Sequence, residues 1–396
     1  MSEVAVVGCA TYEYEKVKSA LIEAIEAVSG FDSIGKGTKV AIKANLVASA
    51  APDTATTTHP SVLAALCELL AERGAEVVVG DSPGGLYNGP FLEKIYKTSG
   101  VYECEKYGAV LNRDFSESKA VFEDAKVAKT FTYTGYLDSA DVIINACKLK
   151  THGMMGLSCA AKNMFGTIPG TMKPEYHFRY PSYEAFADML VDLDEYFKPT
   201  LSVCDAIVGM EGNGPTAGKP RAIGCILASK NPHKLDVVAA NIIGLSPESV
   251  PTLASAVSRE LTPASVEKID VYGEYKKYQI SDYDNIAVRR SLLFKGTSDS
   301  IIKNIFGSVA KSVLNSRPKL KKKLCIGCNK CGRICPAKAI VIKNGKAEID
   351  RSLCIRCFCC QEFCPVGAMK VHRTWLARVL QSGKSKHKKT KNSPDR

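Results

Sequence analysis

The C-terminal quarter of the chain carries one cysteine pattern twice. Residues 325–336 read CIGCNKCGRICP, and residues 354–365 read CIRCFCCQEFCP. The four cysteines of Cys-x2-Cys-x2-Cys-x3-Cys and the proline after them recur 29 residues later, as Ala339 does at Ala368. Three thiolates at i, i+3 and i+6 on a tight loop can reach three iron corners of one cubic cluster. We therefore predict a duplicated iron–sulfur-binding unit.

The fourth cysteine of each copy precedes a proline and points away from its own loop. In two-cluster ferredoxins this cysteine ligates the other cluster. Carried over to this chain, that rule divides the eight cysteines into two ligand sets. One [4Fe–4S] cluster takes Cys325, Cys328, Cys331 and Cys364, and the other takes Cys354, Cys357, Cys360 and Cys335.

Zinc is the alternative occupant of a Cys-x2-Cys pair. Zinc sites use two pairs separated by a longer loop and need neither a third cysteine nor the proline. Two full copies of the longer pattern therefore favour iron–sulfur clusters. Cys359 is a ninth cysteine whose spacing does not fit, so we expect it beside the cluster and not as a ligand. All-thiolate ligation favours low-potential, one-electron chemistry.

Charge divides the chain near the same place. Residues 311–396 contain 22 Lys and Arg against 4 Asp and Glu, whereas residues 1–310 contain 31 against 37. Seven cysteines are scattered through residues 1–310 without ligand spacing, and we interpret them as small buried apolar residues. The chain thus predicts a mildly acidic body joined to a basic domain of different chemistry.

We expect the protein to be cytoplasmic. No run approaches the ~18 uninterrupted apolar residues that a membrane-spanning helix needs. The N-terminus has no basic segment before its short apolar run, so it is interpreted as a strand and not as a signal peptide. Thiols in the cytoplasm stay reduced, so 16 cysteines need a role other than disulfides.

Strands and helices alternate in the body. Apolar runs predict strands at 4–7, 40–42, 77–79, 142–145, 201–203 and 223–227. Helical periodicity lies between them, for example at 61–72 after His59-Pro60 and at 183–196. This alternation predicts an α/β fold with a mostly parallel sheet.

Four segments follow from these patterns. We assign residues 1–298 to the α/β body and 299–323 to an amphipathic helix and a basic linker. Residues 324–372 form a small α+β domain with two [4Fe–4S] clusters, and 373–396 a basic tail. Within the small domain, Asn344-Gly345 between apolar runs predicts a two-residue hairpin.

Polar residues gather at the ends of the predicted strands of the body. These residues are Lys43, Asn45, Asp81, Ser82, Lys148, Lys150, His152 and Asp205. The carboxyl edge of an open α/β sheet is where ligands bind. Lys148, Lys150 and His152 alternate, so an extended backbone sends them to one face. Two ammonium groups there suit a carboxylate or phosphate, and the alternative is a solvated strand end.

The catalytic role of these groups is a hypothesis. Its candidates are Lys43, Asp81, Lys148, Lys150 and His152. The loop at 210–220 is not a P-loop, because Asn213 stands where glycine is needed and Pro220 where serine or threonine is needed. That loop either approaches an anion or connects two elements without a ligand. His177 is expected in a loop without a recognisable partner.

Several segments together resemble a known family. They are NACKLKTHGMMGLSCAAKNMFGTIPG (145–170), GDSPGG (80–85), MEGNGPTAGKP (210–220) and CFCCQEFCP (357–365). They resemble the domain of unknown function 362 family, in its version fused to a C-terminal bacterial-type ferredoxin domain. The resemblance runs from about residue 3 to 371. It implies an iron–sulfur redox role and supplies no agreed substrate or catalytic residues.

Two functions remain open at this point. In the first, the protein transfers single electrons through its clusters, and the body binds a small anionic ligand or a redox partner. In the second, it is a ferredoxin-coupled enzyme acting on a carboxylate- or phosphate-bearing substrate at the strand ends. A carrier alone would not need 300 further residues. No G-x-G-x-x-G follows a strand, so a nucleotide fingerprint is absent.

The basic tail predicts an acidic redox partner. The lysines of 384–391 would steer such a protein electrostatically. Nucleic acid is not expected, because the tail follows no recognised binding motif. Apolar residues between Val371 and Leu380 form a stripe that we expect to pack on the protein, with an anionic membrane surface as the alternative.

Overall fold

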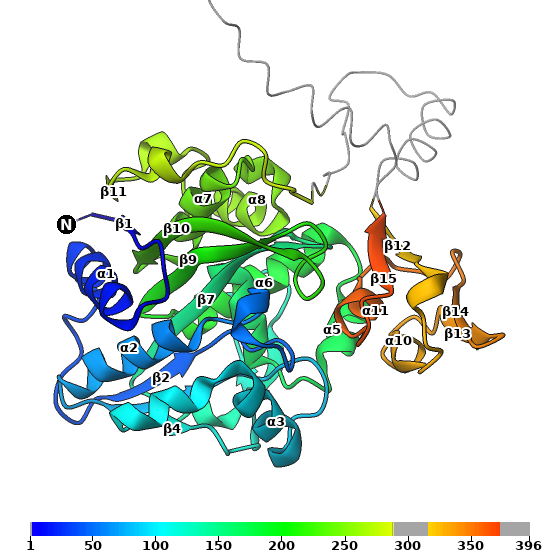
Figure 1. Ribbon diagram of the computed structural model, residues 1–396, viewed down its shortest axis with the longest axis horizontal. Helices are drawn as coiled ribbons and strands as arrows, with labels where there is room; N and C mark the ends of the chain where they lie inside the picture. The colour runs from blue at the N-terminus through cyan, green and yellow to red at the C-terminus, as the bar shows by residue number, and fades with distance from the viewer. Residues whose placement is uncertain (1, 287, 289–315, 373–396) are drawn as a thin grey trace, which may run out of the picture.

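The computed structural model describes residues 2–286, 288 and 316–372. Figure 1 shows a large body with a smaller C-terminal domain packed against one side of it. The helix expected over 299–315 and the basic tail of 373–396 lie outside the described residues. In the described part, no helix is both long and apolar enough to cross a membrane.

A nine-stranded sheet forms the centre of the body. Its order is β11-β1-β10-β9-β7-β2-β3-β4, and β8 pairs with β7. The strands are β1 (Val4–Gly8), β2 (Lys39–Lys43), β3 (Glu76–Gly80), β4 (Val110–Leu111), β7 (Val142–His152), β8 (Gly156–Ser158), β9 (Leu201–Glu211), β10 (Lys219–Ser229) and β11 (Val271–Tyr272). Pairs β9–β7–β2–β3–β4 are parallel, as is β1–β11, whereas β10 is antiparallel to both neighbours. The predicted α/β body with a mostly parallel sheet is confirmed.

Helices cover both faces of this sheet. They are α1 (Tyr14–Ala27), α2 (Pro60–Ala71), α3 (Gly89–Ser99), α4 (Ala160–Asn163), α5 (Lys173–Arg179), α6 (Tyr183–Phe197), α7 (Pro232–Ile242) and α8 (Pro251–Ser258). As expected, α2 begins after His59, whose Nδ1 accepts a hydrogen bond from Ser61 N at 3.2 Å. A separate hairpin of β5 (Glu117–Val121) and β6 (Thr130–Thr134) packs beside α6.

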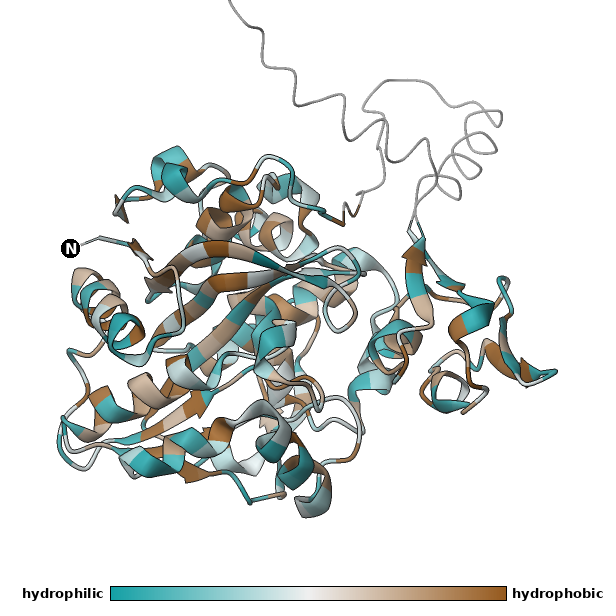
Figure 2. Ribbon diagram, viewed as in Figure 1, coloured by the Kyte–Doolittle hydropathy of each residue, from teal (hydrophilic) through white to brown (hydrophobic). Residues whose placement is uncertain are grey.

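Alternating side chains of the central strands build two cores. Ile144 and Ala146 of β7 join the core beneath α1, α2 and α3. Cys147 and Leu149 point to the other face and join the core beneath α7 and α8. Figure 2 shows hydrophobic residues concentrated along the middle of β9 and β10. Strands covered on both faces are expected to be apolar over most of their length.

Strand β7 extends well beyond its predicted end. The apolar run predicts a strand over 142–145, with Lys148, Lys150 and His152 at its end. The strand continues to His152, and Lys148 and Lys150 are fully buried within it. Their ammonium groups have buried hydrogen-bond acceptors, which offset the cost of removing them from water. His177 also differs from expectation: it lies in α5, stacked on Phe186 at 4.2 Å between ring centroids.

The C-terminal domain is built from two pairs of short antiparallel strands and two helical turns. Its elements are β12 (Arg317–Leu320), α10 (Lys330–Arg333), β13 (Ile340–Lys343), β14 (Lys346–Ile349), α11 (Cys359–Glu362) and β15 (Met369–His372). The predicted hairpin is confirmed, with Lys343 opposite Lys346 across Asn344-Gly345.

The linker predicted up to residue 323 is wrong at its C-terminal end. Arg317–Leu320 form β12, which pairs antiparallel with β15 and so joins the two ends of the domain. Pro318 is buried whereas Lys319 is exposed. Strand alternation thus places lysines on the outer side, and the resulting charge run resembles a linker.

Candidate functional site

The strand ends of β2, β3 and β7 form a buried polar edge. Lys43 at the end of β2 and Asp81 after β3 make an ion pair of 2.7 Å in which both side chains are buried. Lys43 Nζ also donates to Ala44 O at 2.7 Å, and Asp81 accepts from Leu46 N at 2.7 Å. Burial lowers the pKa of Lys43, and the neighbouring Asp81 opposes this shift. This pair anchors the two strand ends to each other.

Lys150 has a different environment, because its partners are uncharged. Its ammonium donates to Asn45 Oδ1 at 2.6 Å and to Thr56 O at 2.7 Å. Burial lowers the pKa of Lys150 to about 7, and Lys148 and Lys162 add to the shift. The amide of Asn45 is held in turn by Asn163 at 2.9 Å.

Lys148 does not join this edge. It donates to Asp205 Oδ2 and to Tyr12 Oη, both at 2.7 Å. The Tyr12 ring stacks on His59 with 3.6 Å between centroids, and His59 N donates to Asp205. The three residues predicted on one face of β7 do share that face, but each has a separate partner. The ammonium of Lys148 is neutralised where it lies.

His152 connects the body to the C-terminal domain. Its Nδ1 accepts from Met154 N and Met155 N, both at 3.1 Å, so Nε2 carries the proton. Nε2 lies 3.0 Å from Oε1 of Glu362 in α11. Burial lowers the pKa of His152. Burial opposes ionisation of Glu362, but the bond from His152 and nearby cations lower its pKa to about 2. The imidazole and the carboxylate thus lie in direct contact across the interface.

Backbone and ring contacts complete the docking of the two domains. Asn213, in the loop between β9 and β10, accepts from Gln361 through its backbone oxygen and from Val371 N through Oδ1, at 2.9 and 3.0 Å. A Cβ on Gly84 would lie 2.4 Å from the Phe363 ring, so only glycine allows this approach. The 210–220 loop therefore has an interdomain role that the sequence analysis did not weigh.

A cavity of about 940 Å³ lies between the strand ends and the C-terminal domain. Asn45, Asp81 and His152 line it from the body, and Glu362 and Cys364 line it from the other side. Five cationic side chains also line it. They are Lys94, Lys162, Lys173, Lys330 and Arg333. The lining carboxylates of Asp81 and Glu362 already have partners, so the cavity is electropositive.

None of these five cations is among the site residues predicted from the sequence. Lys173 donates to Ile168 O at 2.9 Å and to Ser82 O, and burial lowers its pKa to about 7. The ammonium of Lys162 lies 4.7 Å from the centroid of the Phe165 ring, a contact that leaves its N–H groups for a ligand. Lys162 lies in α4 and Lys173 begins α5, within or just after the 145–170 segment that carries the family resemblance.

The cluster cysteines gather as two sets in the C-terminal domain. One small cavity is lined by four of their thiols. They are Cys325, Cys328, Cys331 and Cys364. Burial raises the pKa of Cys335, and the neighbouring Cys357 and Cys354 of the second copy add to the shift. Each copy thus sends its fourth cysteine to the other copy, which is the grouping that two iron–sulfur clusters with exchanged ligands require.

The duplication extends to the hydrogen bonds on sulfur. Ala339 N donates to Cys335 Sγ at 3.2 Å, and Ala368 N donates to Cys364 Sγ at 3.1 Å. Such N–H groups stabilise thiolates and tune cluster potentials. Cys359 is 2% exposed, and its contact with Cys357, together with burial, raises its pKa well above the ordinary value. These donors fit iron–sulfur clusters, whose chemistry when bound is one-electron transfer.

The chain thus has an α/β body joined to a small domain with two cysteine sets, each completed by the fourth cysteine of the other copy. This combination is typical of dicluster iron–sulfur proteins. Residues 317–365 match the 4Fe-4S dicluster domain, and residues 40–241 match the Domain of unknown function (DUF362). The chain belongs to this DUF362 family. The dicluster match supports an iron–sulfur electron-transfer role.

Three individual proteins are similar to this chain. The thylakoid-associated protein of Synechocystis sp. is 32% identical over 265 residues, which are 65% of this chain and 79% of that protein. A protein of Thermotoga maritima superposes with a TM-score of 0.34 at 17% identity over 55% of each chain. The lactate racemase apoprotein of Thermoanaerobacterium thermosaccharolyticum gives 0.41 at 11% identity, over 62% of this chain and 58% of its own. The chain spans little more than half the length of these two solved proteins.

Proposed function

We propose that the protein transfers single electrons through two [4Fe–4S] clusters and holds a small anionic ligand in the interdomain cavity. The observation that carries this proposal is the position of Cys364. Its loop forms one wall of the cavity, and Lys162 and Lys173 line the same space. In this proposal, the two cysteine sets described above hold the clusters.

The charge of the cavity supports an anionic ligand. Asp81 is paired with Lys43, and Glu362 Oε1 lies 3.0 Å from His152 Nε2. Among the described residues, no other carboxylate lines the cavity, so the four lysines and the arginine of its wall have no acidic partner there. A carboxylate or phosphate would supply that negative charge and accept several hydrogen bonds. The volume of about 940 Å³ suits a small molecule.

A second candidate is catalysis, in which the ligand is a substrate that the clusters reduce or oxidise. The observation that favours it is Lys173, a cavity-lining amine whose pKa burial lowers to about 7. Such an amine can give or take a proton at neutral pH, beside a source of electrons. In the first candidate the ligand leaves chemically unchanged, and in the second it leaves as a product.

Ligand capture tests both candidates. The full chain is purified anaerobically, and small molecules released on denaturation are identified by mass spectrometry before and after reduction. Thermal stability is then followed with inorganic phosphate and succinate as probes. At one hundred times the dissociation constant, a probe stabilises the fold by about 2.7 kcal/mol.

The matched variants are Lys162→Ala and, as a control, Lys36→Ala on the exposed surface. We expect Lys162→Ala to reduce the stabilisation by the better probe at least tenfold in affinity, with iron and sulfide content unchanged. An equal response in Lys162→Ala and Lys36→Ala would contradict the proposed ligand site.

A further inference from the structure

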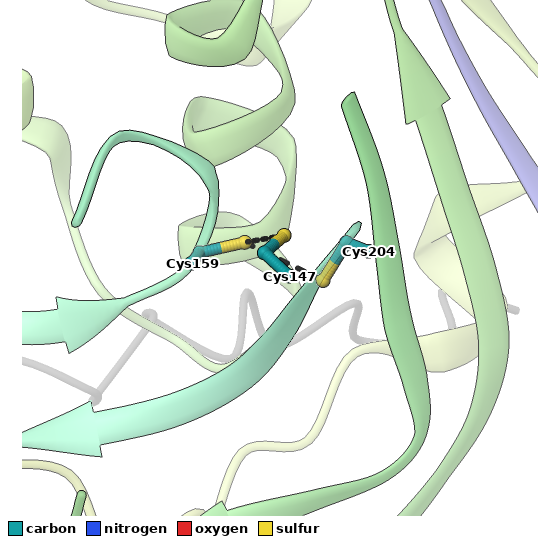
Figure 3. A group of neighbouring side chains, drawn as sticks. All are labelled: Cys147, Cys159 and Cys204. Atoms are coloured by element: carbon teal, nitrogen blue, oxygen red, sulfur yellow. Dashed lines mark hydrogen bonds between the residues drawn. The ribbon is translucent and has the colours of Figure 1, made fainter. Parts of the chain in front are cut away.

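Three cysteines of the body meet in the core although they are far apart in sequence. Cys147 lies in β7, Cys159 directly precedes α4, and Cys204 lies in β9 (Figure 3). The Sγ atoms of Cys147 and Cys159 are 3.8 Å apart, and those of Cys159 and Cys204 are 3.4 Å apart. All three sulfur atoms lie within 4.8 Å of one another. Each residue is at most 1% exposed.

This thiol cluster is separate from the site described above. Cys147 and Leu149 point to the α7 and α8 face of the sheet, whereas Lys148 and Lys150 point to the opposite face. From the sequence alone, we interpret each of these cysteines as a small buried apolar residue. Their convergence on one point is a tertiary feature that sequence spacing does not show.

An acidic group adjoins the cluster on the helix side. Asp236 of α7 accepts from Ala160 N at 2.7 Å and from Ala161 N at 3.1 Å. These bonds hold the backbone that follows Cys159, and the Asp236 carboxyl lies beside the Cys159 thiol.

The three thiols contact one another directly. Cys159 Sγ donates to Cys204 Sγ at 3.4 Å, and Cys147 Sγ lies 3.8 Å from Cys159 Sγ. Three sulfur atoms that converge on one point are the donor set of a soft metal ion.

We propose that Cys147, Cys159 and Cys204 bind one thiophilic metal ion, with Zn²⁺ as the natural candidate. Sulfur atoms at about 2.3 Å from a tetrahedral zinc lie about 3.8 Å from each other. The observed separations of 3.8 and 3.4 Å are close to this value. Binding displaces the three thiol protons to solvent, and the divalent ion compensates two of the three thiolate charges, which leaves the centre with one negative charge.

Asp236 acts as a positioning residue in this proposal. It accepts two backbone N–H bonds at the start of α4 and contacts the Cys159 thiol, so it orients that ligand. The site does not depend on the proposed cavity ligand, because none of the three cysteines lines the cavity.

Metal analysis of the full chain tests the site. The protein is prepared from zinc-supplemented growth, dialysed anaerobically against EDTA, and analysed for zinc, copper, iron and sulfide. We expect about one zinc per chain in addition to cluster iron, because a fully buried ion exchanges slowly. X-ray absorption at the zinc edge should show sulfur neighbours at about 2.3 Å. Copper held with the same sulfur neighbours supports the site equally, since both ions are thiophilic.

Three alanine variants separate this site from its surroundings. Cys204→Ala should lose the EDTA-resistant zinc, whereas Cys67→Ala, at another fully buried cysteine in α2, should retain it. Cys328→Ala should lose iron and retain the zinc, which distinguishes the body site from zinc misplaced in a cluster. Wild-type protein without zinc or copper overturns the proposal outright, as does equal zinc in Cys204→Ala and Cys67→Ala.

Discussion

The contact between His152 and Glu362 should contribute to the stability of the docked domains. Its atoms are 3.0 Å apart, and the side chains are 1% and 17% exposed. The pKa of Glu362 falls from 4.5 to about 2 on folding. At 1.36 kcal/mol per pKa unit, this shift corresponds to about 3 kcal/mol in favour of the folded, ionised form. Glu362→Gln keeps an acceptor but removes the charge, so we expect a loss of about 1–3 kcal/mol.

The sign of the pH dependence follows from the direction of the shift. A carboxyl group whose pKa is lowered on folding stabilises the protein above its unfolded pKa, and this contribution is lost as the pH falls from 4.5 toward 2. The difference between wild type and Glu362→Gln should therefore be constant between pH 6 and 8. Anaerobic urea unfolding at three pH values measures it, with exposed Glu248→Gln as the control. Equal stability of Glu362→Gln and wild type, or a difference that grows steadily from pH 8 to 6, would refute the reasoning.

Three further predictions follow from the same contacts. Anaerobic protein should contain about eight iron atoms and eight sulfides. Cys335→Ala should damage the cluster held by the second cysteine copy, which electron paramagnetic resonance can follow. Loss of signal from the cluster of the first copy alone would exclude exchanged ligands. Gly84→Ala should lower the free energy of unfolding by about 1–3 kcal/mol, because the added methyl group overpacks against Phe363. If both the stability and the radius of gyration of this variant equal those of the wild type, the docked interface is wrong. Lys150 is neutral above about pH 7 when folded but charged up to about 10.5 when unfolded, so its contribution to stability rises with pH across that range. Urea unfolding of Lys150→Met should lack this rise, and an identical pH profile would contradict the lowered pKa.

The parts of the fold that local sequence determines were predicted well. The α/β alternation follows from apolar runs of strand length between amphipathic helices, and both are local patterns. The Asn344-Gly345 hairpin follows from the backbone that a two-residue turn needs. Pro60 is favoured at the first position of a helix, so α2 begins there and His59 occupies the N-cap position. Errors arose where charge suggested exposure, as in β12 and the C-terminal half of β7.

The candidate site was predicted in part. Lys43, Asp81 and His152 do meet near the carboxyl edge of the sheet, because parallel strands bring their ends together. Lys148 separates from them, since its nearest acceptor is Asp205 on a neighbouring strand. Which side chains pair across neighbouring strands depends on the register of those strands. Register cannot be predicted from the residues of one strand alone.

By itself, the sequence determined the iron–sulfur chemistry of the C-terminal domain, because ligand spacing within one loop is a local geometric property. Only the tertiary structure decided what that domain faces. It brings Glu362 to His152 and closes a cavity lined by lysines from segments far apart in the chain. It also brings Cys147, Cys159 and Cys204 together from two strands and a helix start. Such convergence depends on how strands are ordered in the sheet and how the domains dock. Both are set by burial summed over the whole chain.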